Sequence, residues 1–180
     1  ARGNEFSAWR WARPEGGPAF LQCGRQRVFA SISHSGDWLA CAVAGAPIGL
    51  DVEASRKPRD FHALAAQVFS PDECALLLAE RGDPSEPFHR LWTIKEAFGK
   101  RSGNGLRIQD ARRQQPVAVE PGEDGEVETW QGGGMTLALV RPGPEHLASY
   151  AAALRRGWSP DNIRGQAAAD EQLARIGSDP

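Results

Sequence analysis

The chain has 180 residues, of which 41% are apolar and 24% are charged, a composition typical of a globular protein with one sizeable core or two small lobes. This composition argues against collagen-like, coiled-coil and wholly disordered proteins. The formal net charge of -2 argues against bulk electrostatic attraction to nucleic acid or to anionic lipid. We therefore expect no nucleic-acid partner and no membrane partner, and we expect any ligand to be recognised locally.

The cysteines are odd in number and form no C-x-x-C pattern; they are Cys23, Cys41 and Cys74. This pattern favours small, reduced side chains in a cytoplasmic protein over a disulfide framework or a zinc site. The sequence has no apolar run of membrane-spanning length, and its first residues lack the apolar core of a signal peptide. The chain starts without methionine, so we expect that it begins inside a longer protein.

The first half of the chain is predicted to begin with strands and turns. Residues 1–20 indicate a strand fragment followed by a tight turn at residues 14–18. Residues 28–33 and 38–44 are short apolar runs on either side of the polar turn 33–37, which predicts a hairpin. A further strand is expected at residues 48–53, before a basic loop that contains a proline.

Three helices are expected next. Ser70 is a good N-cap, with Pro71 at the first helical position and Glu73 three residues after the cap, which is the pattern of a capping box. A break at residues 82–87 precedes the last of these helices, and a glycine-rich loop follows it. The expected helices are 61–68, 71–80 and 88–100.

The last third of the chain alternates short apolar runs with glycine-rich turns, which predicts further antiparallel strands. Gly132-Gly133-Gly134 is expected to turn a hairpin. From residue 157 onward the sequence is polar and rich in alanine, and we expect one short helix at 167–176 in a peripheral or mobile tail. The expected strands are 117–119, 126–130, 135–140 and 150–154. Helices mixed with antiparallel strands make the fold class α+β.

Asp51 and Glu53 alternate with apolar Leu50 and Val52, so an extended chain projects both carboxylates from one face. Two hard oxygen donors side by side suit a divalent cation. The alternative is that both acids face solvent on a half-buried strand.

Trp92, Glu96 and Lys100 recur every four residues, so a helix stacks them along one side. A third carboxylate together with a lysine suits a cation that is bound to a phosphate. The alternatives are an ordinary salt bridge between Glu96 and Lys100, and a place for Trp92 in the core.

Two further positions have both a functional and a structural interpretation. Glu73 has a full structural explanation in the capping box. His34 is either an exposed loop residue or a donor to a phosphate oxygen. A Ser/His hydrolase is disfavoured because no G-x-S-x-G motif occurs and because the side chains of Ser33 and His34 diverge on extended backbone.

Four motifs, in order, resemble the signatures of the 4'-phosphopantetheinyl transferase superfamily, and most closely its surfactin-synthetase-activating (Sfp-like) type. The similarity runs from about residue 16 to residue 154. The motifs are Ser31-Ile32-Ser33-His34-Ser35, Ile48-Gly49-Leu50-Asp51-Val52-Glu53, Phe69-Ser70-Pro71-Asp72-Glu73 and Trp92-Thr93-Ile94-Lys95-Glu96-Ala97-Phe98-Gly99-Lys100.

The resemblance implies a Mg²⁺-dependent transferase that moves the phosphopantetheine arm of coenzyme A to a serine of an apo acyl or peptidyl carrier protein. Adenosine 3',5'-bisphosphate is released. The resemblance also implies that Asp51, Glu53 and Glu96 bind Mg²⁺ and that Glu96 accepts the proton of the serine.

The resemblance further implies contacts to the coenzyme. Lys100 and Lys95 are expected near the phosphates, and Ser33 with His34 at the 3'-phosphate end. Glu73 is an additional residue near the metal, and Trp92 a possible further site residue.

The resemblance also predicts two pseudo-symmetric α/β lobes with antiparallel strands. Residues 1–47 are expected to be a remnant of the first lobe, 48–156 the second lobe with the metal motifs, and 157–180 the tail. Only 47 residues precede the second lobe, so we expect the first to be incomplete.

The short first lobe leaves the basic residues that bind the 3'-phosphate unassigned. Gly16 and Gly17 stand where related proteins commonly carry lysine or arginine, and the sequence does not choose a replacement. The arginines open to that role are Arg10, Arg13, Arg25 and Arg27.

Two other functions stay open. One is a truncated, non-catalytic module that binds a carrier protein or coenzyme A. The other is a different Mg²⁺-dependent phosphotransferase, which is weaker because no nucleotide-binding fingerprint occurs.

Overall fold

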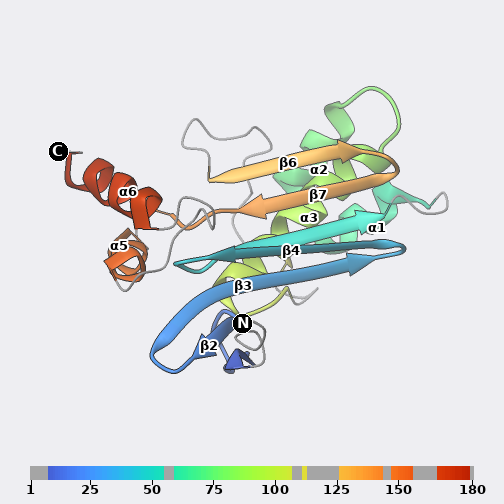
Figure 1. Cartoon of the computed structure of the whole chain (residues 1–180). Coiled ribbons are helices and arrows are strands. Elements are labelled where there is room, and N and C mark those ends of the chain that lie inside the picture. The colour runs from blue at the N-terminus through green and yellow to red at the C-terminus, as the bar shows by residue number, and fades with distance from the viewer. Residues whose placement is uncertain are drawn as a thin grey trace.

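The structure is a computed structural model. Its first sheet has four antiparallel strands in the order β1-β2-β3-β4 (Figure 1). The structure describes residues 8–54, 59–106, 111–112, 126–143, 147–155 and 166–178. The strands are β1 (Arg10–Ala12), β2 (Phe20–Cys23), β3 (Gln26–Ser35) and β4 (Trp38–Ala44). The hairpin expected around residue 36 is confirmed, whereas β2 was not predicted.

The polar residues before that turn lie in a strand and not in the turn itself. Ser33, His34 and Ser35 all belong to β3, and only Gly36 and Asp37 connect it to β4. Because neighbouring residues of a strand point to opposite faces, Ser33 and Ser35 share a face that His34 does not. This separation decides which of the three contacts the carboxylates described below.

The second sheet has three antiparallel strands in the order β5-β7-β6. They are β5 (Gly49–Ala54), β6 (Val127–Gly132) and β7 (Met135–Val140). Gly133 and Gly134 connect β6 to β7 with φ angles of 59° and 75°. A two-residue hairpin turn with positive φ at both positions favours glycine, so the predicted turn is confirmed.

Three helices follow β5 and cover one side of the sheets (Figure 1). They are α1 (Phe61–Val68), α2 (Pro71–Ala79) and α3 (Ser85–Ser102). The capping box of α2 is present, since the Glu73 backbone donates to Ser70 Oγ and the Ser70 backbone donates to Glu73 Oε2. The first two helices match their predicted bounds, and α3 begins three residues earlier than predicted.

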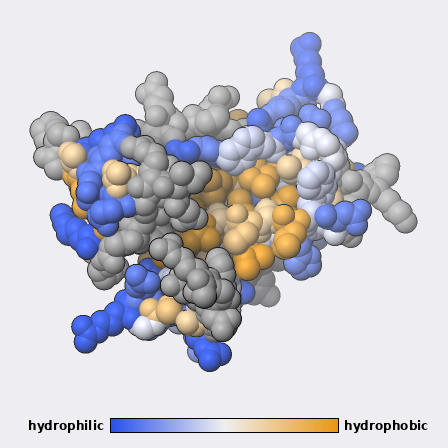
Figure 2. Space-filling view, in the orientation of Figure 1, coloured by the Kyte–Doolittle hydropathy of each residue, from blue (hydrophilic) through white to orange (hydrophobic). Residues whose placement is uncertain are grey.

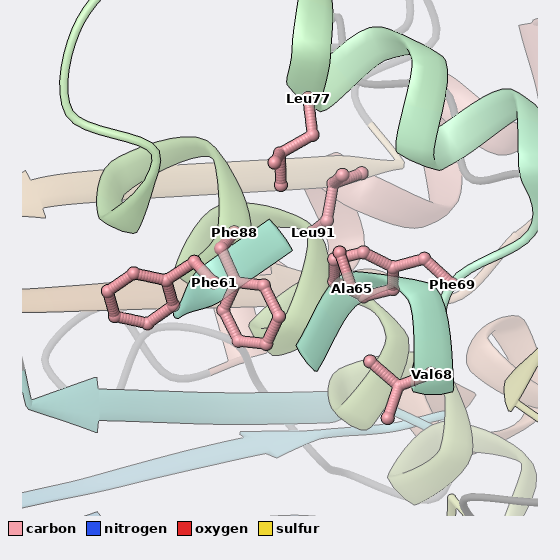
Figure 3. Packing of buried hydrophobic residues seen from close by; sticks show 7 residues of the cluster. All are labelled: Phe61, Ala65, Val68, Phe69, Leu77, Phe88 and Leu91. Carbon is pink, nitrogen blue, oxygen red and sulfur yellow. The ribbon is translucent and has the colours of Figure 1, made fainter. Parts of the chain in front are cut away.

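Aromatic rings pack these helices together (Figure 3). The ring centroid of Phe88 on α3 lies 5.1 Å from the ring centroids of Phe61 and Phe69. Phe61 belongs to α1, and Phe69 is the residue that follows this helix. Tilted aromatic pairs at this distance stabilise a core beyond the area that they bury. A second cluster joins α3 to β7 through Ile94, Ala97 and Ala138.

The residues described from position 147 onward form two helices, which corrects one prediction. Residues 150–154 were expected to form a strand but lie in α5 (Leu147–Arg155), which packs against α6 (Gln166–Ser178). The run is rich in alanine, which has the highest helix propensity. The helix expected at 167–176 is confirmed as α6, and the expected strand at 117–119 lies outside the described residues.

The α+β class with antiparallel strands is confirmed, whereas the two pseudo-symmetric lobes and the domain bounds stay predictions. In the view of Figure 2, apolar residues gather over the middle of the molecule, where Figure 1 shows the strands. Exposed apolar side chains on β3 and β4 include Ile32, Leu39 and Val43. None of the described helices is long and apolar enough to cross a membrane.

Candidate active site

The strand β5 carries two carboxylates on the face of its sheet that α3 covers. Asp51 pairs with Ala138 and Glu53 with Thr136 across β7, so these four side chains share one face. Ala138 packs against Ile94 and Ala97 of α3. Leu50 and Val52 point the other way and are buried, so the predicted alternation is confirmed.

Gly49 allows α3 to lie very close to β5. A Cβ atom at this position would be 1.8 Å from the carbonyl oxygen of Ala97 and 2.9 Å from the backbone nitrogen of Arg101. Both are backbone atoms of the helix, so only glycine fits this crossing. The close approach brings the Lys100 side chain onto Asp51.

Asp51 is the most buried acid of the site and is only partly satisfied. Its Oδ1 atom accepts from Lys100 Nζ at 2.7 Å and from Ser33 Oγ at 2.7 Å. Its Oδ2 atom is buried and has no hydrogen-bond partner among the described residues. Burial raises the pKa of the Asp51 carboxyl, and the neighbouring Lys100 ammonium and Ser33 hydroxyl oppose that rise.

Glu96 is held close to the same charges. Burial raises its pKa from the ordinary value of 4.5 to about 7, and the negative charges of Asp51 and Glu53 act in the same direction. Lys100 lowers it in part. In the described part of the chain Lys100 pairs with Asp51 and not with Glu96, so the salt bridge considered from the helical spacing is not formed.

A row of serines on β3 supports the acids, and the sequence reasoning missed it. Ser31 accepts from the backbone nitrogen of Leu50 at 2.9 Å, Ser33 donates to Asp51, and Ser35 donates to Glu53 Oε2 at 2.9 Å. Their period of two was a readable signal, since every second residue of a strand shares a face. The sequence did not show that this face lies against β5.

His34 lies on the strand face opposite to Ser33 and Ser35 and lines an open pocket with a volume of about 680 Å³. Glu53 forms part of the rim, and Trp92 and Phe88 of α3 form part of the apolar wall. A pocket of this size suits a small-molecule ligand or an extended substrate arm. Trp92 serves both interpretations considered for it, because it lines this pocket and also packs against the aromatic core.

Lys95 and Glu73 form an ion pair inside the protein. Lys95 Nζ lies 2.8 Å from Glu73 Oε1 and donates to the carbonyl oxygen of Ala111 at 2.9 Å, and both side chains are 0% exposed. Glu73 also accepts from the Ser70 backbone in the capping box. Both side chains are therefore committed to each other inside the protein, and the phosphate contact expected of Lys95 and the metal contact expected of Glu73 stay predictions.

No group of three or more His, Cys, Asp and Glu side chains in the described part of the chain is close enough to hold a metal ion. The chemistry of the acids nevertheless fits a hard divalent cation. Asp51 Oδ2 is a buried acceptor without a donor, and the charges of Asp51 and Glu53 reach Glu96. A metal would therefore offset the repulsion that Asp51 and Glu53 exert on Glu96.

Comparisons with known proteins show that the candidate site lies in a part of the chain that matches a known family. A model of the 4'-phosphopantetheinyl transferase superfamily matches residues 47–155, which contain all three acids and Lys100. A 4'-phosphopantetheinyl transferase from Bacillus subtilis is 43% identical to the chain over 79 residues. That match covers 43% of this chain and 34% of the relative.

Two other relatives match a larger part of the chain. The 4'-phosphopantetheinyl transferase HetI from a Nostoc species is 31% identical over 151 residues, which is 82% of this chain and 60% of HetI. The 4'-phosphopantetheinyl transferase AcpT from Salmonella typhimurium is 34% identical over 133 residues, which is 72% of this chain and 65% of AcpT. The matched region spans about a third of the Bacillus relative and less than two thirds of the other two.

Proposed function

Because the chain belongs to the 4'-phosphopantetheinyl transferase superfamily, we propose that it transfers the phosphopantetheine arm of coenzyme A to a serine of an apo carrier protein. The products are the holo carrier and adenosine 3',5'-bisphosphate. The observation that carries the proposal is the meeting of Asp51, Glu96 and Lys100 where β5 crosses α3, inside the region that the family model matches.

The reaction that we propose is a displacement at phosphorus. The serine oxygen of the carrier forms a bond to the phosphorus that bears the pantetheine arm, and the bond from that phosphorus to the bridging oxygen of the pyrophosphate breaks. Glu96 accepts the serine proton, and adenosine 3',5'-bisphosphate leaves with the electron pair of the broken bond. In the metal-free protein, burial raises the pKa of Glu96 to about 7, so its carboxyl group takes up a proton near neutral pH.

Fixed positive charge is the second requirement, because negative charge accumulates on the leaving phosphate. Lys100 supplies one such charge from the helix side of the site. Asp51, Glu53 and Glu96 are the residues that would hold Mg²⁺, which when bound neutralises pyrophosphate charge. Ser33 and Ser35 orient Asp51 and Glu53 for that task, because each donates a hydrogen bond to its acid.

The large pocket is the space that we assign to the transferred arm. It begins at Glu53, and its apolar wall is formed by residues such as Leu64, Val68 and Trp92. His34 and Arg59 bring polar donors to its rim. An arm that alternates methylene groups with amides suits walls of this mixed character.

The test is the mass of a carrier protein. Incubation of an apo acyl or peptidyl carrier with the chain, coenzyme A and Mg²⁺ should add one phosphopantetheine mass to the carrier. Asp51→Ala and Glu96→Gln should abolish that gain, whereas Glu80→Gln, which changes an exposed acid paired with Arg90, should leave it intact. No mass gain with carriers of several types would contradict the proposal.

A second candidate function is the binding of a carrier protein or coenzyme A without transfer. Calorimetry that detects carrier binding, combined with no Mg²⁺-dependent mass gain, would identify this function. We also propose a cytoplasmic location, where coenzyme A and carrier proteins are available together.

A further inference from the structure

Glu53 has a neighbour with a hydroxyl group on each of two sides. On the β3 side, Ser35 donates to Glu53 Oε2 at 2.9 Å. On the β7 side, Thr136 lies directly across from Glu53, and side chains paired in this way have Cβ atoms about 4.5 to 5.5 Å apart. Asp51 differs, because its partner on β7 is Ala138, whose side chain has no donor. The strand β7 therefore offers a polar group to Glu53 and none to Asp51.

The hydroxyl group of Thr136 is buried and is only partly satisfied. Thr136 is 3% exposed, and its Oγ1 atom accepts from the side-chain nitrogen of Gln131 at 3.4 Å. The hydroxyl donates to no acceptor among the described residues. A buried donor without an acceptor is costly. This hydroxyl is therefore available to a carboxylate on the same face of the sheet.

Gln131 gives the Thr136 hydroxyl a direction. Gln131 lies across from Thr136 on β6, so a polar row runs from Glu53 through Thr136 to Gln131 over three strands. Because Oγ1 accepts a hydrogen bond from the Gln131 side, its own hydrogen must point elsewhere. The Gln131 side chain also donates to the carbonyl oxygen of Glu86 at 3.0 Å. The row thus ties Thr136 to the first turn of α3, the helix that carries Glu96.

We propose that Thr136 is a positioning residue that donates a hydrogen bond to the Glu53 carboxylate when the acids bind a divalent cation. The proposal rests on the proposed function, since it assumes that Glu53 holds the metal. Among the described residues, Ser35 is the only hydrogen-bond donor to this carboxylate in the structure. A second donor from the β7 side restricts rotation of the carboxylate, and hydrogen bonds of this kind orient metal ligands in proteins.

A purely structural role is the competing explanation. Threonine is β-branched and is favoured in strands, and the bond from Gln131 gives its hydroxyl one partner in any case. Loss of the hydroxyl would then lower the stability of the protein but would leave its affinity for metal ions unchanged. A metal-binding measurement separates the two roles.

The experiment measures the dissociation constants of Mn²⁺ and Mg²⁺ by calorimetry, without coenzyme A and without a carrier protein. Thr136→Val keeps the shape of the side chain and removes the hydroxyl, whereas Thr136→Ser keeps the hydroxyl. The control Thr129→Val makes the same change on β6, across from Ala138 and not from an acid. Thr136→Val should weaken the binding of both metals about fivefold to tenfold. Thr136→Ser and Thr129→Val should each stay within about twofold of the parent chain.

Two further measurements make the test independent of one variant. Thr136→Ala also removes the hydroxyl and should weaken metal binding as much as Thr136→Val does. In the carrier mass assay, Thr136→Val should raise the Mg²⁺ concentration needed for half-maximal modification and should leave the rate at saturating Mg²⁺ unchanged. A residue that only supports the fold would not cause this split.

Parental metal affinity in Thr136→Val and Thr136→Ala overturns the role of Thr136 alone, and so does an equal loss in Thr136→Ser or Thr129→Val. A parent chain that binds neither metal overturns the metal site of the proposed function and this role with it. A parent chain that binds metal but modifies no carrier overturns the proposed transfer and not the role of Thr136.

Discussion

Lys100 Nζ lies 2.7 Å from Asp51 Oδ1, so the ammonium neutralises the acid that we expect to bind a metal. The same oxygen also accepts from Ser33, while Asp51 Oδ2 has no partner among the described residues. A metal ion that approaches Asp51 therefore meets one carboxylate oxygen that is free and one that is already bound to a cation. We therefore expect Lys100 and a metal to compete for this acid until a phosphate draws Lys100 away.

Lys100→Met should strengthen metal binding by the chain in the absence of coenzyme A. Removal of the positive charge beside Asp51 should raise the affinity for Mg²⁺ or Mn²⁺ by about threefold to tenfold. Carrier modification should fall at the same time, because a fixed charge for the phosphate is lost. Calorimetry with each metal measures the first effect, and the carrier mass assay measures the second.

The matched control for that variant is Arg101→Met. Arg101 is the next residue of α3, but it pairs with Glu126 and lies on the Phe98 ring. Its loss should leave the metal affinity nearly unchanged. A Lys100→Met variant that binds metal more weakly than the parent would show that Lys100 organises Asp51 for the metal and does not compete with it.

Glu96 should make the metal-free protein less stable as the pH rises. Its pKa is about 7 in the folded state against an ordinary value of 4.5, so between these values the folded chain keeps a proton that the unfolded chain has lost. The free energy of unfolding therefore falls as the pH rises through this window, and the contribution of the proton is complete below about 4.5. Removal of the ionisable group should abolish this loss.

The comparison of Glu96→Gln with the parent isolates this contribution. In EDTA, the melting temperature of the variant minus that of the parent should rise by a few degrees between about pH 5 and pH 8. Glu80→Gln, which alters an exposed acid, should show no such trend. A constant difference between Glu96→Gln and the parent across this range would mean that burial does not raise the pKa of Glu96.

The buried pair of Lys95 and Glu73 should behave as one unit in stability measurements. Lys95→Met leaves a carboxylate inside the protein without its ammonium and should lower the free energy of unfolding by about 3 to 5 kcal/mol. Glu73→Gln keeps an acceptor for the Ser70 backbone but leaves the ammonium unpaired. The double variant should lose clearly less than the sum of the two single losses.

Urea unfolding of the four chains measures the coupling between the two residues. The exposed pair of Arg90 and Glu80 is the reference, and Glu80→Gln should cost no more than about 1 kcal/mol. Additive losses for Lys95→Met and Glu73→Gln would contradict a direct interaction.

The relative placement of the candidate acids was predictable from the sequence because it follows from local periodicity. Alternation gave the shared face of Asp51 and Glu53, and a spacing of four gave the shared side of Glu96 and Lys100. The partner of each lysine was not predictable. Lys95 and Lys100 lie on different sides of α3, and the sequence does not show which side meets the strands and which side meets α2. Sequence spacing describes a helix, but not what packs on each of its sides.

The errors in the fold have a similar cause. Residues 150–154 are apolar enough for a strand, but they are rich in alanine and belong to α5, which packs on α6. The serines of β3 show the period of a strand face, but their contact with β5 is a tertiary one. In both cases the sequence does not show which elements pack against each other.

Gly49→Ala should damage stability and the site together. The added Cβ would lie 1.8 Å from the carbonyl oxygen of Ala97, and neither this backbone atom nor the strand can move without separating β5 from α3. We expect a loss of about 2 to 4 kcal/mol in the free energy of unfolding. The same separation lengthens the contact between Asp51 and Lys100, so coenzyme A should bind more weakly as well.

Gly17→Ala is the comparison for stability, because its Cβ would meet a ring carbon of Pro14 at 2.9 Å and no backbone atom. A proline ring can adjust its pucker, so this variant should lose less than about 1 kcal/mol. Urea unfolding and calorimetry with coenzyme A measure the two effects of Gly49→Ala. A Gly49→Ala chain as stable as Gly17→Ala would show that β5 and α3 are farther apart than this structure places them.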